Sequence, residues 1–166
     1  MPENIRWKKH LLSITIFLLL FLLIRAYQLN DYATGPAPVF SATSIEGNIV
    51  SLNQLREKPV LIYFWATWCP ICKLHKQTIE DLSRDYTVVT VASWSEAITE
   101  VRDYFSNTTL KQMTIYDLDG ALAKRYGISA VPSFFILDNK GDIRFIERGY
   151  TSSVGLRIRL FIAQHL

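Results

Sequence analysis

The sequence predicts an α/β protein in which helices cover a central β-sheet. Pro59–Trp65 is a continuous apolar run of strand length, which suits a strand that is buried on both faces. A second run, Thr87–Ala92, is rich in β-branched residues. Near the C-terminus, strands over Ser133–Leu137 and Ile143–Arg148 are followed by an amphipathic helix over Thr151–His165. Such an alternation of strands and helices is typical of a sheet with helices packed on it.

The remaining elements are predicted from periodicity and from turn or cap residues. The loop over Asp138–Asp142 contains a glycine and joins the last two strands as a hairpin, and Thr151 or Ser152 caps the last helix. In chain order the other predictions are short strands over 37–41 and 47–52, a helical turn over 52–57, a helix from Ile71 to Tyr86, a helix over 95–106 with Ser95 as N-cap and Glu96 in its first turn, a strand over 113–116 and a helix over 120–126.

Two cysteines lie between the first buried strand and the helix that follows it. Cys69 and Cys72 therefore meet the unpaired N–H groups and the positive dipole end of that helix, which lower a thiol pKa from about 8.5 into roughly the 3.5–7.5 range. Lys73 adds a cation that acts in the same direction. We expect Cys69 to be the more exposed, attacking sulfur and Cys72 to resolve the mixed disulfide. Pro70 suits the first helical position.

Other uses of a cysteine pair fit less well. Buried structural cysteines are common, but the spacing and the position at a helix start disfavour them. A structural zinc site needs four ligands, and besides the two cysteines the chain offers only His75 and His165 beyond the N-terminal apolar segment. Covalent haem attachment needs a histidine directly after the second cysteine, where this chain has Lys73. We therefore expect no metal site.

The segment Phe64–Lys73 (FWATWCPICK) resembles the active site of the thioredoxin superfamily. Over Ala37–Leu166 the pattern resembles membrane-anchored TlpA-like thiol-disulfide oxidoreductases, including the ScsD-like and CcmG/DsbE-like branches. The resemblance implies a thioredoxin fold, with a central mixed sheet flanked by helices, a strand–helix insertion in the middle and an N-terminal transmembrane helix. It also implies a redox-active Cys69–Cys72 disulfide and no other cofactor.

A second functional segment is Ala130–Ser133 (AVPS). Most X–Pro bonds are trans. A proline that enters a central strand has no N–H to donate to the neighbouring strand, however, so its presence there needs a reason. In the proteins that this segment resembles, the proline is cis and lies beside the disulfide, and the preceding residue offers its backbone to the substrate. These roles carry over to Pro132 and Val131, and Trp68 and Pro70 complete the predicted substrate-binding surface.

The chain also departs at two places from the proteins that it resembles. Tyr63 stands where many thioredoxins have a buried Asp that helps to deprotonate the second cysteine; Glu96 is a candidate replacement, although an exposed Glu at a helix start is the simpler interpretation. The segment Gly127–Phe134 (GISAVPSF) lacks the Glu that commonly follows the cis proline in the cytochrome c maturation branch. This departure favours the copper-tolerance or general branch.

The N-terminal segment predicts an uncleaved membrane anchor rather than a cleaved signal peptide. Leu11–Ile24 carries no charge, and Ala26 to Leu29 extend it to nearly spanning length. Four of the 18 basic and one of the 15 acidic residues lie in the first 25, so the rest is balanced and gives no sign of nucleic-acid binding. The predicted organisation is a cytoplasmic N-terminus over 1–10, an anchor over 11–29, a linker over 30–36 and a thioredoxin-like domain over 37–166.

Together these features predict a single-pass protein of the inner membrane whose catalytic domain faces the periplasm. There it would act on protein thiols and disulfides through Cys69 and Cys72, as a reductant supplied by a DsbD-like transmembrane thiol reductase. Two alternatives stay open: a thiol reductase of cytochrome c maturation, and a copper-handling dithiol protein without turnover.

Overall fold

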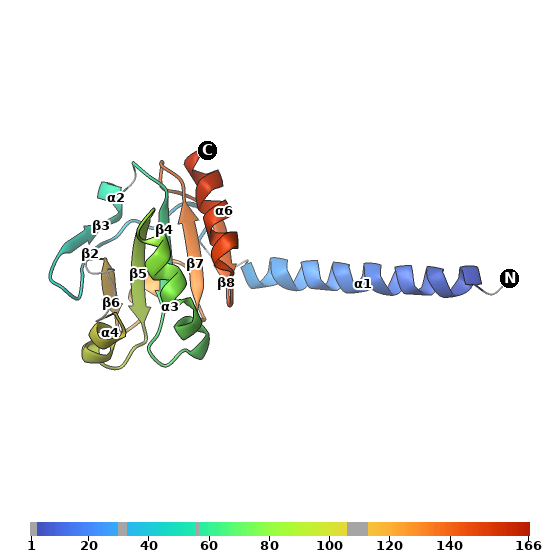
Figure 1. Ribbon diagram of the computed structural model, residues 1–166, viewed down its shortest axis with the longest axis horizontal. Coiled ribbons are helices and arrows are strands. Elements are labelled where there is room, and N and C mark those ends of the chain that lie inside the picture. Colours follow the sequence, from blue (N-terminus) through green and yellow to red (C-terminus); the bar gives the residue numbers. More distant parts are fainter. Residues whose placement is uncertain (1–2, 30–32, 56, 106–112) are drawn as a thin grey trace. The chain divides into compact units, whose positions relative to one another are not determined.

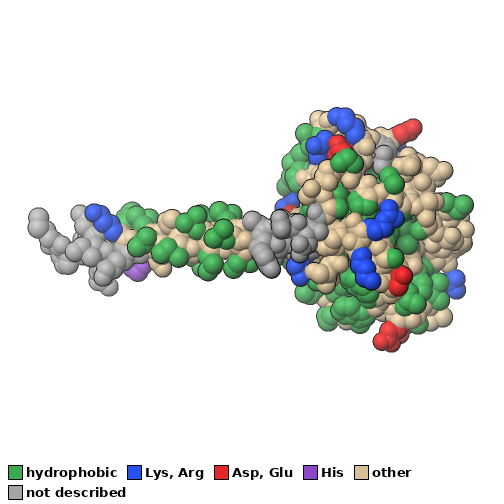
Figure 2. Space-filling view, turned by 180° about the vertical axis from the view of Figure 1, so that it is seen from behind, with side chains coloured by type: hydrophobic (Ala, Val, Ile, Leu, Met, Phe, Trp, Pro, Cys, Tyr) green, Lys and Arg blue, Asp and Glu red, His purple; other side chains and the backbone are tan. Residues whose placement is uncertain are grey.

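The computed structural model describes residues 3–29, 33–55, 57–105 and 113–166. The chain divides into two compact units, one up to Tyr32 and one from Ala33 onward. The first unit contains a single long helix, α1 (Glu3–Leu29). Figure 2 shows hydrophobic side chains along the visible face of this helix. Within the described residues, however, no helix combines the length and the apolar character needed to cross a membrane.

The second unit is built on a six-stranded mixed sheet in the order β1-β8-β7-β4-β5-β6 (Figure 1). β4, β5 and β6 run parallel, whereas β7 is antiparallel to β4 and to β8, and β1 is antiparallel to β8. A separate antiparallel pair is formed by β2 and β3. The strands are β1 (Gly35–Pro36), β2 (Ser41–Thr43), β3 (Ile49–Ser51), β4 (Val60–Trp65), β5 (Thr87–Ser93), β6 (Thr114–Asp117), β7 (Ser133–Leu137) and β8 (Asp142–Arg148).

Helices join and cover these strands. Figure 1 shows α3 and α6 side by side over one face of the sheet, and the two helices contact each other. Between β5 and β7, where the sequence predicts an inserted strand–helix unit, the chain forms α4, the edge strand β6 and α5. The predicted α/β fold with a mixed sheet is thus confirmed. The helices are α2 (Leu52–Leu55), α3 (Pro70–Leu82), α4 (Ile98–Tyr104), α5 (Ala121–Arg125) and α6 (Ser153–Gln164).

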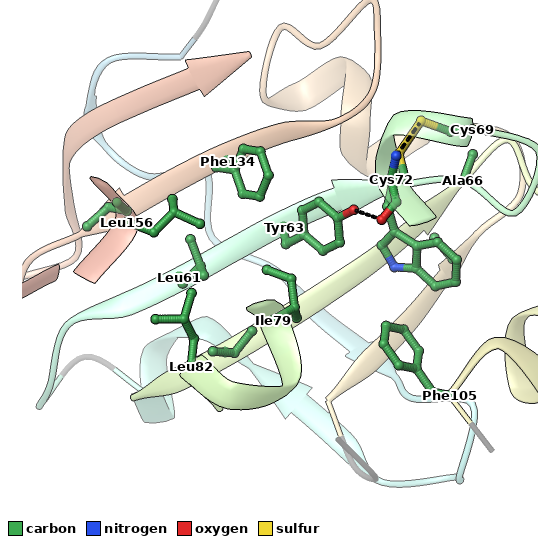
Figure 3. Packing of buried hydrophobic residues seen from close by; sticks show 14 of the residues in the cluster. Leu61, Tyr63, Ala66, Cys69, Cys72, Ile79, Leu82, Phe105, Phe134 and Leu156 are labelled. Carbon is green, nitrogen blue, oxygen red and sulfur yellow. Dashed lines mark hydrogen bonds between the residues drawn. A yellow bond between two sulfur atoms is a disulfide. The ribbon is translucent and has the colours of Figure 1, made fainter. Parts of the chain in front are cut away.

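The core explains why β4 is apolar at every position. Each of its six residues is fully buried, as the sequence predicts for a strand covered on both faces. Leu61, Tyr63 and Trp65 belong to one hydrophobic cluster with residues of α3 and α6 (Figure 3). The intervening Phe64 instead packs against the rings of Phe135 and Tyr126. Successive side chains of a strand alternate between the faces, so both faces demand apolar residues.

Two predicted helix boundaries are wrong. The helix after the cysteines ends at Leu82 rather than Tyr86, with Ser83 as its C-cap. Helix α4 begins only at Ile98, because Ser95 is buried and its Oγ accepts the N–H of Thr67 instead of capping a helix. Residue 106, the predicted end of that helix, lies outside the described residues.

The predicted linker over 30–36 is partly structured. Gly35 and Pro36 form β1, which pairs with Ile143 and Asp142 on β8. Proline is tolerated there because β1 lies at the edge of the sheet. Residues 30–32 of that linker lie outside the described residues.

Candidate active site

The two cysteines lie at the start of α3, as the sequence predicts. Cys69 is the N-cap, with an extended backbone, and Pro70 occupies the first turn. The N–H of Cys72 donates to Cys69 Sγ at 3.1 Å, and the two sulfurs form a disulfide with the Cα atoms 5.2 Å apart (Figure 3). The sulfur of Cys69 therefore occupies the place where a helix N-terminus binds an anion, which stabilises a thiolate there.

Both cysteines are buried, whereas several apolar residues close to them in the sequence are exposed to solvent. Cys69 is 3% exposed and Cys72 is 0% exposed, so the expected difference in exposure between them is small. Trp68, Ile71 and Leu74 are large apolar residues that remain exposed around the pair. The sequence assigned Ile71 and Leu74 to the buried face of α3, but only Ile79 and Leu82 reach the core. The first two instead remain exposed at the surface.

The second predicted segment lies directly beside the disulfide. The Val131–Pro132 peptide bond is cis, as predicted. The carbonyl oxygen of Val131 lies 3.9 Å from Cys69 Sγ, so the backbone of this residue reaches the first sulfur of the pair. The carbonyl oxygen of Pro132 accepts the N–H of Gly149 at 2.9 Å. This bond ties the proline segment to the loop between β8 and α6.

Trp68 is held in place although its ring is 58% exposed. Its indole Nε1–H donates to the carbonyl oxygen of Trp94 at 2.9 Å. Trp94 has a left-handed backbone, with φ 56°, which is rare for a bulky residue. Its ring occupies the space that a Cβ on Gly120 would fill, because that atom would lie 2.1 Å from the Trp94 Nε1. A chain of two close contacts thus runs from Gly120 to the exposed ring at the active site.

Two tyrosines lie beneath the disulfide. The hydroxyl groups of Tyr63 and Tyr104 both donate to the carbonyl oxygen of Cys72, at 3.3 Å and 3.0 Å. Burial, and to a lesser extent the electrostatic effect of the neighbouring Tyr104, raises the pKa of Tyr63 far above its ordinary value. Burial also raises the pKa of Tyr104 to about 12. Both groups are therefore neutral donors at neutral pH and cannot act as the carboxylate base found at this place in many thioredoxins.

Glu96, the candidate replacement for that base, lies at the surface, in keeping with the simpler interpretation of an exposed Glu. Its side chain is exposed, and it lines an open groove of about 610 Å³ beside Trp68 and Lys73. Among the described residues, no group of three or more Cys, His, Asp and Glu side chains is placed to hold a metal ion. The remaining lining residues of the groove are Thr67, Glu100, Asp103 and Tyr104.

Sequence reasoning missed the role of one buried residue near the pair. His75, weighed only as a zinc ligand, is 1% exposed and lies one turn after Cys72 on α3. It packs against Tyr63, Phe134 and Tyr150 at ring-centroid distances of 6.3, 5.0 and 5.2 Å. A polar residue on the apolar face of the helix, at the third position after the second cysteine, was the available signal.

Comparison with known proteins places this geometry in a family. The family model described as the AhpC/TSA family matches residues 33–146. A Haemophilus influenzae protein described as thioredoxin-like is 38% identical over 122 residues, which make up 72% of each chain. The thiol:disulfide interchange protein DsbE of Tatumella citrea is 29% identical over 152 residues, or 80% of this chain and 82% of that protein.

The fold is shared with solved structures as well. A crystal structure of a thiol:disulfide interchange protein of the thioredoxin family, from Chlorobium tepidum, superposes with a TM-score of 0.68. The superposition covers 79% of this chain and 97% of the Chlorobium tepidum chain, and the two are 24% identical in sequence. This chain therefore belongs to the AhpC/TSA family of thioredoxin-like proteins, and its Cys69–Cys72 pair makes it a protein disulfide oxidoreductase related to DsbE.

Proposed function

We propose that this protein is a membrane-tethered reductant of protein disulfides on the periplasmic side of the inner membrane. The observation that carries the proposal is the position of Cys69, which caps α3 and lies 3.9 Å from the carbonyl oxygen of Val131. In this arrangement Cys69 attacks a substrate disulfide, and Cys72 resolves the mixed disulfide that results. Trp68, Pro70, Val131 and Pro132 form the surface against which the substrate lies.

The tether is supported by the composition of α1. From Leu11 to Ile24 this helix has no charged residue, and its large apolar side chains are exposed. Large apolar side chains that are exposed over such a stretch favour an apolar surrounding such as a lipid bilayer. Arg6, Lys8 and Lys9 precede this stretch, and basic residues on that side favour a cytoplasmic N-terminus.

The reducing direction rests on resemblance and on location. The segment around the cysteines resembles TlpA-like proteins, which receive electrons from a transmembrane thiol reductase. The compartment outside the inner membrane is kept oxidising, so a dithiol that stays reduced there needs such a donor. A tether would raise the effective concentration of Cys69 and Cys72 near it. The Ser133 that follows Pro132, in place of a Glu, favours the ScsD-like branch over cytochrome c maturation.

Trapping of substrates tests the roles of the two sulfurs. In cells that express full-length Cys72→Ser, mixed disulfides with partner proteins should accumulate because the resolving thiol is absent. Cys69→Ser should trap few partners because it lacks the attacking sulfur. Non-reducing gels before and after thiol reduction reveal the adducts. Equal trapping by both variants would contradict the assigned roles.

The redox state in cells tests the direction and the donor. Acid quenching followed by thiol alkylation should show the pair mainly reduced in unperturbed cells, and oxidised after deletion of the DsbD-like donor. A pair that is mainly oxidised in both strains would mean an oxidising role. Loss of c-type cytochromes on deletion of this protein would support the cytochrome c alternative.

The copper-handling alternative makes a different prediction. Stoichiometric, tight Cu(I) binding by the reduced chain, without reduction of insulin or oxidation of protein thiols, would favour it. We expect turnover of protein disulfides instead, measured with the full-length chain in detergent.

A further inference from the structure

His75 connects the active-site helix to the loop between β8 and α6. Its Nδ1 lies 3.0 Å from the carbonyl oxygen of Ile71, one turn earlier on α3. Its Nε2 lies 3.1 Å from the N–H nitrogen of Thr151 and 3.1 Å from the carbonyl oxygen of the same residue. A buried imidazole is thus bonded to the backbone of two elements that are 76 residues apart in the sequence.

The partners assign the protons of the neutral ring. Because Nδ1 faces only a carbonyl oxygen, it carries the hydrogen and donates to Ile71. Nε2 then accepts the N–H of Thr151. Both nitrogens are satisfied in this tautomer, so the ring is fixed in position although it is 1% exposed.

The loop that His75 holds lies next to the substrate surface. Gly149 donates its N–H to the carbonyl oxygen of Pro132, and Val131 contacts Cys69 Sγ. Between Gly149 and Thr151 lies Tyr150, whose side chain is 68% exposed. The inner side of its ring packs on His75 at a centroid distance of 5.2 Å. His75 is thus the support beneath an exposed aromatic ring that borders the cis-proline segment.

We propose that His75 is a positioning residue for substrate proteins, and that Tyr150 is the docking residue it positions. His75 holds the 149–151 loop against α3, and this fixes the ring of Tyr150 next to Gly149, whose N–H donates to the carbonyl oxygen of Pro132. An exposed aromatic ring that is already fixed loses little freedom when a partner binds, so it contributes to affinity. The inference rests on Cys69 being the sulfur that meets the substrate, as proposed above.

The test separates protein docking from disulfide chemistry. Full-length variants in detergent are assayed with insulin as the protein disulfide, and with dithiothreitol as a small reductant of Cys69–Cys72. His75→Leu keeps the apolar volume but removes the bonds to Thr151, and Tyr150→Ala removes the ring. Each should raise KM for insulin about tenfold, the equivalent of about 1.4 kcal/mol of lost binding, with kcat changed less than about twofold. The rate with dithiothreitol should stay at the wild-type value.

Two further variants make the result specific. His75→Gln should restore the wild-type KM, because a carboxamide offers one acceptor and one donor to the N–H and carbonyl of Thr151. Gln77→Ala, on the exposed side of α3, is the matched control and should also leave KM unchanged. The His75→Leu, Tyr150→Ala double variant should have the KM of the single variants, because both act through the same ring.

The outcomes distinguish this inference from the proposed direction of electron flow. Since Tyr150 is exposed, Tyr150→Ala measures the contribution to docking even where His75→Leu fails to fold. An unchanged KM for Tyr150→Ala, or equal losses with insulin and dithiothreitol, would overturn the inference. A wild-type protein that oxidises reduced unfolded ribonuclease but does not reduce insulin would end the reductant proposal. In that case the same KM pattern, measured with the reduced ribonuclease, supports the positioning role, and its absence overturns it.

Discussion

Tyr63 places a neutral hydroxyl beneath the disulfide. It donates to the carbonyl oxygen of Cys72, the last residue of the Cys-Pro-Ile-Cys segment (Figure 3). Tyr104 donates to the same oxygen. A carboxylate at this place would repel a thiolate nearby, whereas a hydroxyl whose pKa is raised by burial adds no charge. The start of α3 therefore stabilises a Cys69 thiolate without an opposing charge at the position of Tyr63.

Removal of these two hydroxyl groups should show that they share one acceptor. Tyr63→Phe and Tyr104→Phe should each lower the free energy of unfolding by about 1 kcal/mol, the usual net value of one hydrogen bond. The double variant should cost more than the sum, because only then does the buried carbonyl lose both side-chain donors. Urea unfolding of the oxidised protein measures all four states of this cycle, and strictly additive costs would contradict shared support.

Asp138 is a buried carboxylate whose contribution to stability depends on pH. Burial by itself would raise its pKa, but the N–H groups of Asp142 and Lys140 and the guanidinium of Arg144 together lower the pKa below the ordinary value. Because the folded-state pKa is depressed, the stabilisation is present above the unfolded pKa of about 3.9 and is lost as the pH falls through the folded value.

Asp138→Asn should therefore destabilise the protein at pH 7 by about 1–3 kcal/mol, the cost of weakened bonds to a charged group. The difference in unfolding free energy between the wild type and Asp138→Asn should shrink as the pH is lowered below about 4. Urea unfolding of both proteins across this pH range measures the difference. A constant difference would mean that the charge of Asp138 contributes nothing.

At the scale of elements, the turns of the chain depend on space as well as on backbone angles. Gly47 and Gly120 both have positive φ, at 89° and 67°. A Cβ on Gly47 would meet nothing within 4 Å, whereas one on Gly120 would overlap the ring of Trp94. Substitutions at these two glycines therefore separate the cost of the left-handed backbone from the cost of displacing Trp94.

Gly47→Ala should cost about 1 kcal/mol of unfolding free energy from the backbone alone. Gly120→Ala should cost more and should also move Trp94, whose carbonyl accepts the indole N–H of Trp68. The Trp68 indole N–H signal in a ¹⁵N–¹H NMR spectrum should therefore shift in Gly120→Ala and not in Gly47→Ala. An unshifted signal would disconnect Gly120 from the active site.

At the scale of the whole molecule, the catalytic unit is separate from α1. The unit from Ala33 onward contains every strand of both sheets and all of the described site residues. We therefore predict that a chain beginning at Ala33 keeps the redox potential of the full chain. Its thermal midpoint should stay within about 2 °C of the full chain's, which is a smaller shift than a 1 kcal/mol change in stability would cause. Calorimetry and equilibration with glutathione measure both, and a changed potential would show that α1 acts on the site.

The proposed tether is tested in cells. The full chain should stay with the membrane fraction after extraction with alkaline carbonate. The unit from Ala33 onward, exported with a cleavable signal, should be released and should be re-reduced more slowly by a membrane donor. Release of the full chain by the same extraction would exclude an integral anchor.

The elements that were predicted correctly are those whose signal is local. β4 and β5 show apolar runs that only a covered strand needs, and Cys69 with Pro70 carries the chemistry of a helix start. The errors arise where a distant partner decides. Ser95 looks like an N-cap, but the N–H of Thr67, 28 residues away, takes its hydroxyl. Leu74 fits the apolar period of α3, yet no element of the described structure covers it.

The sequence by itself determined the fold class, the pair of sulfurs and their place at a helix start, because each follows from the order of neighbouring residues. Only the tertiary structure decided what surrounds that pair. Tyr63, Tyr104 and His75 come from β4, α4 and α3, and they meet because the sheet brings β4 beneath the helix. The same holds for Gly149, whose bond to Pro132 joins segments 17 residues apart. Contacts of this kind depend on how the chain connects its strands and helices, which no local sequence pattern encodes. Hydrogen bonds and packing follow distance in space rather than distance along the chain.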